Sequence, residues 1–280
     1  SLLGRLGHAR VPLPGGCRIG ARPVVEHIRG LKALGAHVSV EHGVVTACVK
    51  GSSKRLTGAS IVLDCPSVGA TETLLMAAVL ADGNTTIENA AQEPEITDLG
   101  NALIKAGAKI EGLDTATITI QGVPKLTQIQ HSVIPDRVEA ATLLIAGAIT
   151  NGDVTIHNVV PDHFEALIRK LKDMGLEMDV QENWIRIQRK GPLQAVDIET
   201  LPFPGFPTDM QAQMCSLFAV TPGISVVTDT IFPQRFMHAS EMKRMGADIE
   251  VDDGRAVITG VEQLSAAPVM ASDLRASVSL

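Results

Sequence analysis

The chain has 280 residues, of which 45% are hydrophobic and 20% are charged, and its formal net charge is −7. This composition is typical of a globular protein with room for one large domain or two smaller ones. The acidic balance and the aromatic content of 2% argue against nucleic-acid binding, which favours a basic face and aromatic stacking platforms.

The cysteines and histidines are scattered, with no CxxC pair and no histidine at metal-ligand spacing. This pattern predicts reduced thiols in a cytoplasmic protein, and neither a disulfide framework nor a metal site. The longest apolar runs are far shorter than the ~20 residues of a membrane-spanning helix. No signal peptide is expected before the fold. The four cysteines are Cys17, Cys48, Cys65 and Cys215.

The first informative stretch of the chain, residues 14–23, surrounds Cys17. Its three glycines and two prolines predict a loop, because neither a helix nor a regular strand accommodates them. Arg18 and Arg22 flank the cysteine and favour its thiolate form. The loop therefore suits a reaction on a small anionic substrate. The alternative is a buried, inert cysteine beside a turn.

A glycine-centred unit then recurs along the chain. Its anchor glycines follow one another at nearly equal intervals, at positions 35, 107, 175 and 246. A second set of turn glycines has almost the same spacing, at positions 83, 152 and 223. Both sets give a period of about 70 residues, which predicts a duplicated supersecondary unit.

Each unit contains an apolar helix, a β-rich run, an amphipathic helix that stops at the anchor glycine, and two short strands. Alternating helices and strands predict an α/β fold with helices packed on sheets. The expected apolar helices are 73–80, 140–149 and 211–219, the β-rich runs are 85–88, 154–157 and 225–228, the amphipathic helix is 164–174, and the strand pairs are 109–112 with 117–121 and 248–251 with 256–259.

The first copy differs from the others around Cys17. Its stretch from turn glycine to anchor glycine, Gly7 to Gly35, is longer than in the later copies by about four or five residues, which are those of the Cys17 loop. Departures from a structural repeat tend to be loops that carry function. The chain also begins and ends at the same phase of the repeat, so we expect a fragment of a longer protein that lacks parts at both ends.

Three arginines are candidate anion contacts: Arg22, Arg235 and Arg275. A guanidinium binds phosphate or carboxylate bidentately, although an arginine taken singly is more often a solvated or ion-paired surface residue. Asp209 precedes the helix 211–219, where it either caps the helix or accepts a proton from a hydroxyl substrate. Ser67 begins a sequence that opens another helix, whose free N–H groups could hold a phosphate.

Together these motifs resemble the UDP-N-acetylglucosamine 1-carboxyvinyltransferase family of enolpyruvyl transferases. The resemblance covers the whole chain, and Gly-Gly-Cys in the first loop separates it from the sister enzyme 5-enolpyruvylshikimate-3-phosphate synthase. The motifs are residues 13–17, 19–23, 67–71, 93–96, 206–213, 235–238 and 273–277.

The resemblance implies two similar globules, each an inside-out α/β barrel of three repeats, with the active site between them. Residues 1–130 would belong to the first globule, with the Cys17 loop, and residues 131–280 to the second. The family transfers the enolpyruvyl group from phosphoenolpyruvate to the 3-hydroxyl of UDP-N-acetylglucosamine and releases phosphate. This reaction begins peptidoglycan synthesis, and therefore supports cell-wall biogenesis, cell shape, the cell cycle and cell division.

By resemblance, Cys17 is the proton donor that forms an adduct with phosphoenolpyruvate and with fosfomycin, and Asp209 takes the proton from the sugar hydroxyl. No cofactor, metal, nucleic acid or membrane is implied, and the localisation is cytoplasmic. Cys65-Pro66 replaces a segment in which family members often carry a lysine near the diphosphate. The implied substrate-binding residues are Arg22, Pro23, Val24, Val25, Glu26, Ser67, Val68, Gly69, Ile231, Arg235 and Arg275.

Two alternatives stay open: an enolpyruvyl transferase with another acceptor, and a non-catalytic paralogue that binds UDP-sugar. The Gly-Gly-Cys loop disfavours the first, and the joint presence of Cys17, Asp209 and three arginines disfavours the second. The family's early Lys-Asn pair and a late arginine lie outside this chain, so the resemblance leaves open whether the chain alone turns over substrate.

Overall fold

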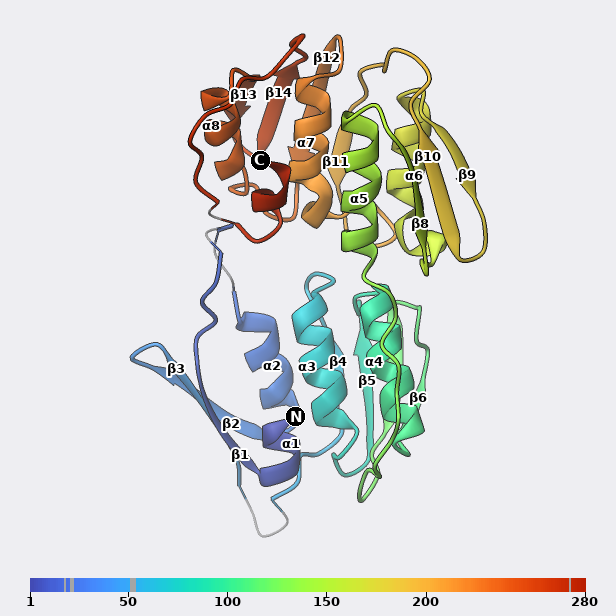
Figure 1. Cartoon of the computed structure of the whole chain (residues 1–280). Coiled ribbons are helices and arrows are strands. Elements are labelled where there is room, and N and C mark those ends of the chain that lie inside the picture. The colour runs from blue at the N-terminus through green and yellow to red at the C-terminus, as the bar shows by residue number, and fades with distance from the viewer. Residues whose placement is uncertain (18, 21–22, 51–53, 272) are drawn as a thin grey trace. The chain divides into compact units, whose positions relative to one another are not determined.

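The computed structural model divides the chain into two units (Figure 1). It describes residues 1–17, 19–20, 23–50, 54–271 and 273–280. Unit 1 comprises Ser1–Gly15 and Arg22–Ile134, and unit 2 comprises Gly16–Ala21 and Pro135–Leu280. Cys17 was expected in the N-terminal globule. In the structure residues 16–21 group with unit 2, and the Cys17 thiol accepts a hydrogen bond from the Leu274 backbone N–H.

Unit 1 contains two consecutive repeats. The first consists of α1 (Leu2–Leu6), β1 (His8–Pro12), α2 (Val25–Ala33), β2 (Ala36–Glu41) and β3 (Val44–Val49). The second consists of β4 (Ser60–Val62), α3 (Val68–Ala78), β5 (Asn84–Glu88), α4 (Pro94–Lys105), β6 (Lys109–Glu111) and β7 (Thr117–Gln121).

Unit 2 contains the other two repeats. The third consists of α5 (Arg137–Ile149), β8 (Asp153–His157), the 3-10 helix η1 (Pro161–Phe164), α6 (Glu165–Asp173), β9 (Glu177–Val180) and β10 (Trp184–Gln188). The fourth consists of β11 (Ile198–Thr200), the 3-10 helix η2 (Thr208–Met210), α7 (Gln211–Ala219), β12 (Ile224–Asp229), α8 (Met237–Arg244), β13 (Asp248–Asp252), β14 (Arg255–Thr259) and the 3-10 helix η3 (Ala276–Ser279).

All four repeats share one strand order. The described strands form the sheets β1-β3-β2, β4-β5-β7-β6, β8-β10-β9 and β11-β12-β14-β13. The central pairs are antiparallel in every sheet, and β4 and β11 add a parallel strand to the second and fourth sheets. The predicted α/β class and the repeated unit are therefore confirmed, and each unit contains two of the three repeats that the resemblance implies.

The anchor glycines end the amphipathic helices, as the sequence predicts. Their φ angles are 86° at Gly35, 100° at Gly107, 93° at Gly175 and 91° at Gly246. A side chain is strained at such angles, so glycine suits the position. The turn before β8 differs from the prediction, because Asn151 takes the left-handed conformation, with φ 56°, in place of Gly152.

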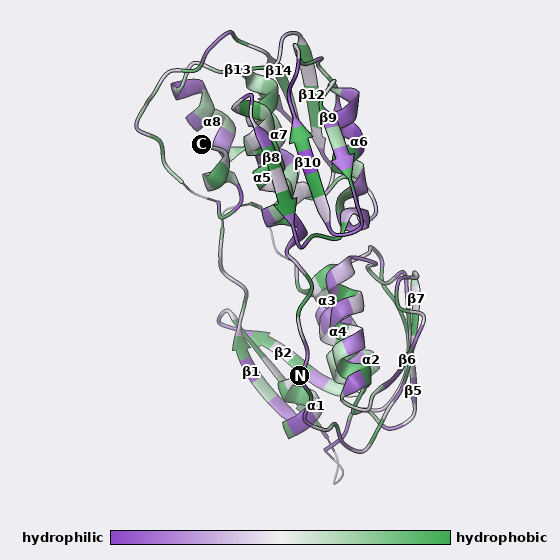
Figure 2. Ribbon diagram, turned by 45° about the vertical axis from the view of Figure 1, so that its right-hand side comes forward, coloured by the Kyte–Doolittle hydropathy of each residue, from purple (hydrophilic) through white to green (hydrophobic). Residues whose placement is uncertain are grey.

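The apolar helices α3, α5 and α7 form the centres of two separate hydrophobic cores. Unit 1 packs around α3, with Leu74 and Leu75 fully buried, and unit 2 packs around α5 and α7. All nine residues of α7 are buried. The sheets cover these helices with one face. Figure 2 shows hydrophobic and hydrophilic residues alternating along β10, whose Ile185 and Ile187 are buried.

Candidate functional site

The Cys17 segment lies against a turn near the C-terminal end of the chain. Beyond β1 the described residues of this segment form no helix or strand, which confirms the predicted loop. The backbone N–H of Leu274 donates to the Sγ atom of Cys17 at 3.2 Å. The thiol is partly exposed, unlike the buried, inert cysteine of the alternative interpretation. Arg18 and Arg22, which were expected to favour the thiolate, lie outside the described residues.

A buried guanidinium, that of Arg235, is the centre of the polar cluster in unit 2. Its side chain is 7% exposed and pairs with two carboxylates. Its Nη1 atom donates to Asp209 Oδ1 at 2.6 Å, and its Nε atom donates to Asp273 Oδ2 at 2.9 Å. The two ion pairs compensate the cost of burying a charge.

Arg275 completes this cluster from the same turn that contacts Cys17. Its Nε atom lies 3.4 Å from Asp209 Oδ2, and its backbone N–H donates to Asp273 Oδ1 at 2.8 Å. The fold therefore brings together four residues that the sequence singles out. Cys17 contacts Leu274, the residue between Asp273 and Arg275, and Asp209 contacts both Arg235 and Arg275.

The electrostatics of the cluster keep its buried pair charged. Burial opposes ionisation of Asp273, but hydrogen bonds from Arg235 and from the Arg275 backbone outweigh it, so the pKa of Asp273 is lowered. Burial likewise opposes the charge of Arg235, but its contacts with Asp273 and Asp209 leave its pKa raised. At both groups burial is the largest single effect, but the hydrogen bonds and ion pairs together outweigh it.

Asp209 does not cap a helix, so that alternative is wrong. It lies in η2, and the described helix starts at η2 and α7 have no side-chain cap. The oxygens of Asp209 accept hydrogen bonds from the two arginines instead. Its side chain is 39% exposed, whereas that of Asp273 is 5% exposed. Asp209 is thus the carboxylate of the cluster that a ligand can reach.

Asp229, at the end of β12, also belongs to this region, although the sequence did not single it out. It accepts hydrogen bonds from the Thr208 hydroxyl at 2.7 Å and from the Ile231 backbone N–H at 3.0 Å. Thr208 in turn accepts a hydrogen bond from Arg235 Nη1 at 3.3 Å. The sequence signal that could have indicated Asp229 is its place at the end of a strand, where an aspartate can accept hydrogen bonds from the backbone N–H groups that follow it.

The remaining predicted binding residues lie in unit 1, where α2 packs beside α3 (Figure 1). Ser67 opens α3, as predicted, and its hydroxyl accepts from the Ala70 backbone N–H at 3.3 Å. Val68 and Gly69 follow in the first turn of α3. A Cβ atom on Gly69 would lie 3.2 Å from Cε1 of His27, so a larger residue would crowd this helix start.

The other predicted residues of unit 1 surround the start of α2. Pro23 and Val24 precede the helix, and Val25 and Glu26 lie in its first turn. The carboxylate of Glu26 accepts hydrogen bonds from Arg29 at 2.6 Å and from the Asp64 backbone N–H at 3.2 Å. Glu26 thus fixes α2 to the end of β4 within unit 1.

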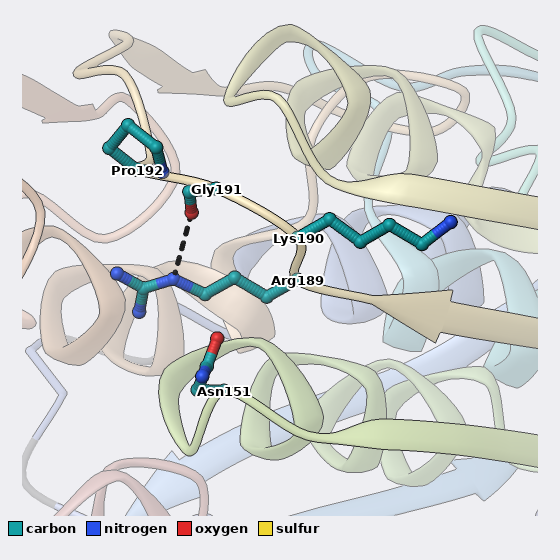
Figure 3. Close-up of a pocket in the computed structure, with 5 residues that line it drawn as sticks. All are labelled: Asn151, Arg189, Lys190, Gly191 and Pro192. Carbon is teal, nitrogen blue, oxygen red and sulfur yellow. Dashed lines mark hydrogen bonds between the residues drawn. The ribbon is translucent and has the colours of Figure 1, made fainter.

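Two hollows on the surface of unit 2 share no residue with this cluster. Figure 3 shows one of about 450 Å³, where the Arg189 side chain lies between Asn151 and Gly191. Its cations already have partners, because Arg189 donates to the Gly191 carbonyl at 3.3 Å and Lys190 pairs with Glu177 at 2.6 Å. Within the described residues, no group of three or more His, Cys, Asp or Glu could hold a metal ion. None of the described helices has the length and apolar character of a membrane span.

With this fold and cluster established, family membership follows. The family model described as EPSP synthase (3-phosphoshikimate 1-carboxyvinyltransferase) matches residues 1–280, so the chain belongs to the EPSP synthase family.

Within that family, the chain is similar to proteins named UDP-N-acetylglucosamine 1-carboxyvinyltransferase. It is 62% identical over 281 residues to the one from Parasynechococcus marenigrum (strain WH8102), covering 100% of this chain and 65% of the relative. It is 53% identical over 279 residues to UDP-N-acetylglucosamine 1-carboxyvinyltransferase 1 from Staphylococcus aureus (strain N315), covering 100% of this chain and 66% of that relative. The chain thus spans about 65% of the length of these relatives.

Two solved structures share the fold. The enolpyruvyl transferase NikO from Streptomyces tendae matches with a TM-score of 0.84 and 24% identity, over 99% of this chain and 66% of that chain. An EPSP synthase from Acinetobacter baumannii matches with a TM-score of 0.65 and 21% identity, over 99% of this chain and 68% of that chain.

Proposed function

We propose that the full-length protein transfers the enolpyruvyl group from phosphoenolpyruvate to the 3-hydroxyl of UDP-N-acetylglucosamine and releases phosphate. The observation that carries this proposal is the cluster of Cys17, Asp209, Arg235 and Arg275, joined through the turn at Leu274. The proposal is supported by the names of relatives up to 62% identical to this chain. The chemistry needs an acid, a base and cations, and the cluster contains these residue types.

In the proposed mechanism, Asp209 accepts the proton of the sugar 3-hydroxyl. At the same time the oxygen of that hydroxyl forms a bond to C2 of phosphoenolpyruvate. Cys17 donates a proton to the methylene carbon. The Cys17 thiolate then takes a proton back from that carbon, which restores the double bond as the C–O bond breaks and phosphate leaves. Arg235 and Arg275 stabilise the negative charge of the phosphate and carboxylate groups.

The ion pairs of Asp209 bear directly on this mechanism. The two oxygens of Asp209 accept from Arg235 and lie beside Arg275, so the carboxylate has to give up one of these contacts before it meets the sugar hydroxyl. Arg275 has a side chain that is 31% exposed, and Arg235 has one that is 7% exposed. We therefore assign Arg275 as the arginine that turns to the incoming anion and frees Asp209, while Arg235 stays fixed by Asp273.

The UDP-sugar is assigned to the residues that the resemblance implies. In this assignment the backbone N–H groups at the start of α3 bind the diphosphate, since helix starts favour anions. The proposed contacts are Arg22, Pro23, Val24, Val25, Glu26, Ser67, Val68, Gly69 and Ile231, and Arg22 lies outside the described residues.

The proposed cellular role is the first committed step of peptidoglycan synthesis in the cytoplasm, with consequences for cell shape and division. Fosfomycin would act by alkylating Cys17. Metals, redox cofactors and nucleic acids have no part in this proposal.

The test is phosphate release from phosphoenolpyruvate by a protein extended to the full length of the relatives. UDP-N-acetylglucosamine and shikimate 3-phosphate serve as alternative acceptors, because the family model is described by the second reaction. We expect release only with UDP-N-acetylglucosamine. Loss of the base in Asp209→Asn is expected to lower kcat by about 10²- to 10⁴-fold, and Cys17→Ser is expected to lower it strongly.

The matched control is Cys48→Ser, because Cys48 lies in β3 and is partly exposed like Cys17. It should keep the wild-type rate. Release with shikimate 3-phosphate would contradict the proposed acceptor. A folded protein that releases phosphate with neither acceptor would contradict the transferase proposal and favour a non-catalytic UDP-sugar-binding paralogue.

A further inference from the structure

Asp229 is a buried carboxylate held by neutral donors. It is 2% exposed and ends β12. Its Oδ1 atom accepts from the Thr200 hydroxyl at 2.8 Å and from the backbone N–H groups of Ile231 at 3.0 Å and Phe232 at 2.8 Å. Its Oδ2 atom accepts from the Thr208 hydroxyl at 2.7 Å. Within the described residues, Asp229 takes part in no ion pair.

A buried carboxylate costs free energy unless its oxygens are hydrogen-bonded. Any movement of the four donors around Asp229 is therefore unfavourable, and the carboxylate restrains their positions. The two oxygens of Asp229 hold two different loops. Oδ2 fixes Thr208, the residue before Asp209, and Thr208 also accepts from Arg235 at 3.3 Å. Oδ1 fixes Ile231 and Phe232, in the loop between β12 and α8.

We propose that Asp229 is a positioning residue. It fixes the carboxylate of Asp209, which takes the proton, relative to Ile231, which contacts the acceptor sugar. This inference rests on the proposed function and extends it to a residue that touches neither substrate. It predicts that the Thr208 branch controls the chemical step, through Asp209 and Arg235. The Ile231 branch controls affinity for the acceptor.

Two substitutions each break the link between Asp229 and Thr208 and leave the hydrogen bonds to Ile231 and Phe232 in place. In Asp229→Asn, one oxygen can still accept from Ile231 and Phe232, but the amide NH₂ group faces the Thr208 hydroxyl, which already accepts from Arg235. The Thr208 hydroxyl then faces two N–H donors, and its own proton has no acceptor at this site. Thr208→Val removes the same link from the other side, and Thr208→Ser retains it.

The first experiment measures kcat and the KM for UDP-N-acetylglucosamine in the full-length protein. We expect Asp229→Asn and Thr208→Val each to lower kcat by about 10-fold, with a smaller change in KM. The double variant should also lower kcat by no more than about 10-fold, because both substitutions remove the same hydrogen bond between Asp229 and Thr208. Thr208→Ser should stay within about 2-fold of wild type. An additive loss of about 100-fold in the double variant would overturn the inference.

A loss of stability alone could also lower activity, so Val227→Ala is the matched control. Val227 is fully buried in the same strand as Asp229, and its side chain makes no hydrogen bond. Its truncation should destabilise unit 2 through a cavity but leave kcat per folded molecule at the wild-type value. An equal loss of kcat in Val227→Ala and Asp229→Asn would overturn the positioning role.

A second measurement does not depend on activity. Hydrogen exchange of the Ile231 and Phe232 amides, resolved by NMR in the full-length protein, should be at least about 10-fold faster in Asp229→Ala than in Val227→Ala, because only the former loses their acceptor. Unchanged exchange would overturn the inference. A wild-type protein that releases no phosphate would instead defeat the proposed function, and the exchange result would still decide the role of Asp229.

Discussion

Among the single residues, Arg235 shows how one buried charge orders the candidate site. Asp273 is almost fully buried and compensates Arg235, whereas Asp209 is the more exposed of its two carboxylate partners. Removing one partner of a buried pair leaves an uncompensated charge, so Asp273 is needed to keep Arg235 in place. Asp209 is therefore the more accessible of the two carboxylates that pair with Arg235.

His238 is the residue of this region whose protonation should affect stability. It is 2% exposed in α8, and its Nε2 atom has no partner among the described residues. Burial lowers the pKa of His238 to about 4, with Asp273 opposing and Arg235 adding to this shift.

Because the unfolded chain has an ordinary histidine pKa near 6.5, it binds the proton first as the pH falls. We expect the free energy of unfolding to fall by about 3 kcal/mol on account of His238 as the pH is lowered from about 6.5 to about 4. His238→Gln should lack this part of the pH dependence. Urea unfolding followed by Trp184 fluorescence measures this, because Trp184 is the single tryptophan and lies in unit 2.

The control for this prediction is His37→Gln, since His37 is exposed in β2. It should keep the wild-type pH profile. Identical profiles for wild type and His238→Gln would show that the buried imidazole does not contribute.

Among the elements, the second and fourth repeats close in the same way. Gly122 follows β7 and donates to the Gly83 carbonyl at 2.9 Å, and Gly260 follows β14 and donates to the Gly223 carbonyl at 2.9 Å. A Cβ atom would lie 1.7 Å from the Ala81 carbonyl oxygen at Gly122, and 1.6 Å from that of Thr221 at Gly260. The end of the strand thus approaches the end of the core helix so closely that only glycine fits.

Gly260→Ala should therefore destabilise unit 2 by about 3 kcal/mol, because the overlap is with backbone, which must shift. Trp184 fluorescence during urea unfolding gives the free energy. Gly191→Ala is the matched control, since a Cβ atom there would meet nothing within 4 Å. A Gly260→Ala protein as stable as the Gly191→Ala protein would contradict this close approach.

In the molecule as a whole, the two units have separate cores. Leu74 in α3 belongs to the core of unit 1, and Leu144 in α5 belongs to that of unit 2. Both are 0% exposed and lie in apolar helices. This arrangement gives a matched pair of substitutions, one in each unit.

We expect Leu74→Ala and Leu144→Ala each to cost about 2–5 kcal/mol, because each leaves a cavity in a packed core. Hydrogen exchange followed by mass spectrometry should show faster exchange in unit 1 for Leu74→Ala and in unit 2 for Leu144→Ala. Faster exchange throughout both units for either variant would indicate a single cooperative core.

Much of the fold could be predicted from local patterns. The helix 211–219 and the strand 117–121 have the predicted bounds, and the amphipathic helix expected at 164–174 is α6 with η1 before it. These elements depend on the period of apolar residues and on glycine turns, which nearby residues determine. The turn at Asn151 differed from prediction because asparagine also tolerates a positive φ.

Local spacing and chemistry were sufficient to specify the repeat, the α/β class, the loop around Cys17 and the residue types of the candidate site. The pairing of side chains through hydrogen bonds, in contrast, depended on the three-dimensional fold. The fold gave Asp209 two arginines in place of a helix cap, joined Cys17 to Leu274, and brought Asp229 to Thr208. These contacts join residues up to 257 positions apart, and no local pattern encodes a partner at such a distance.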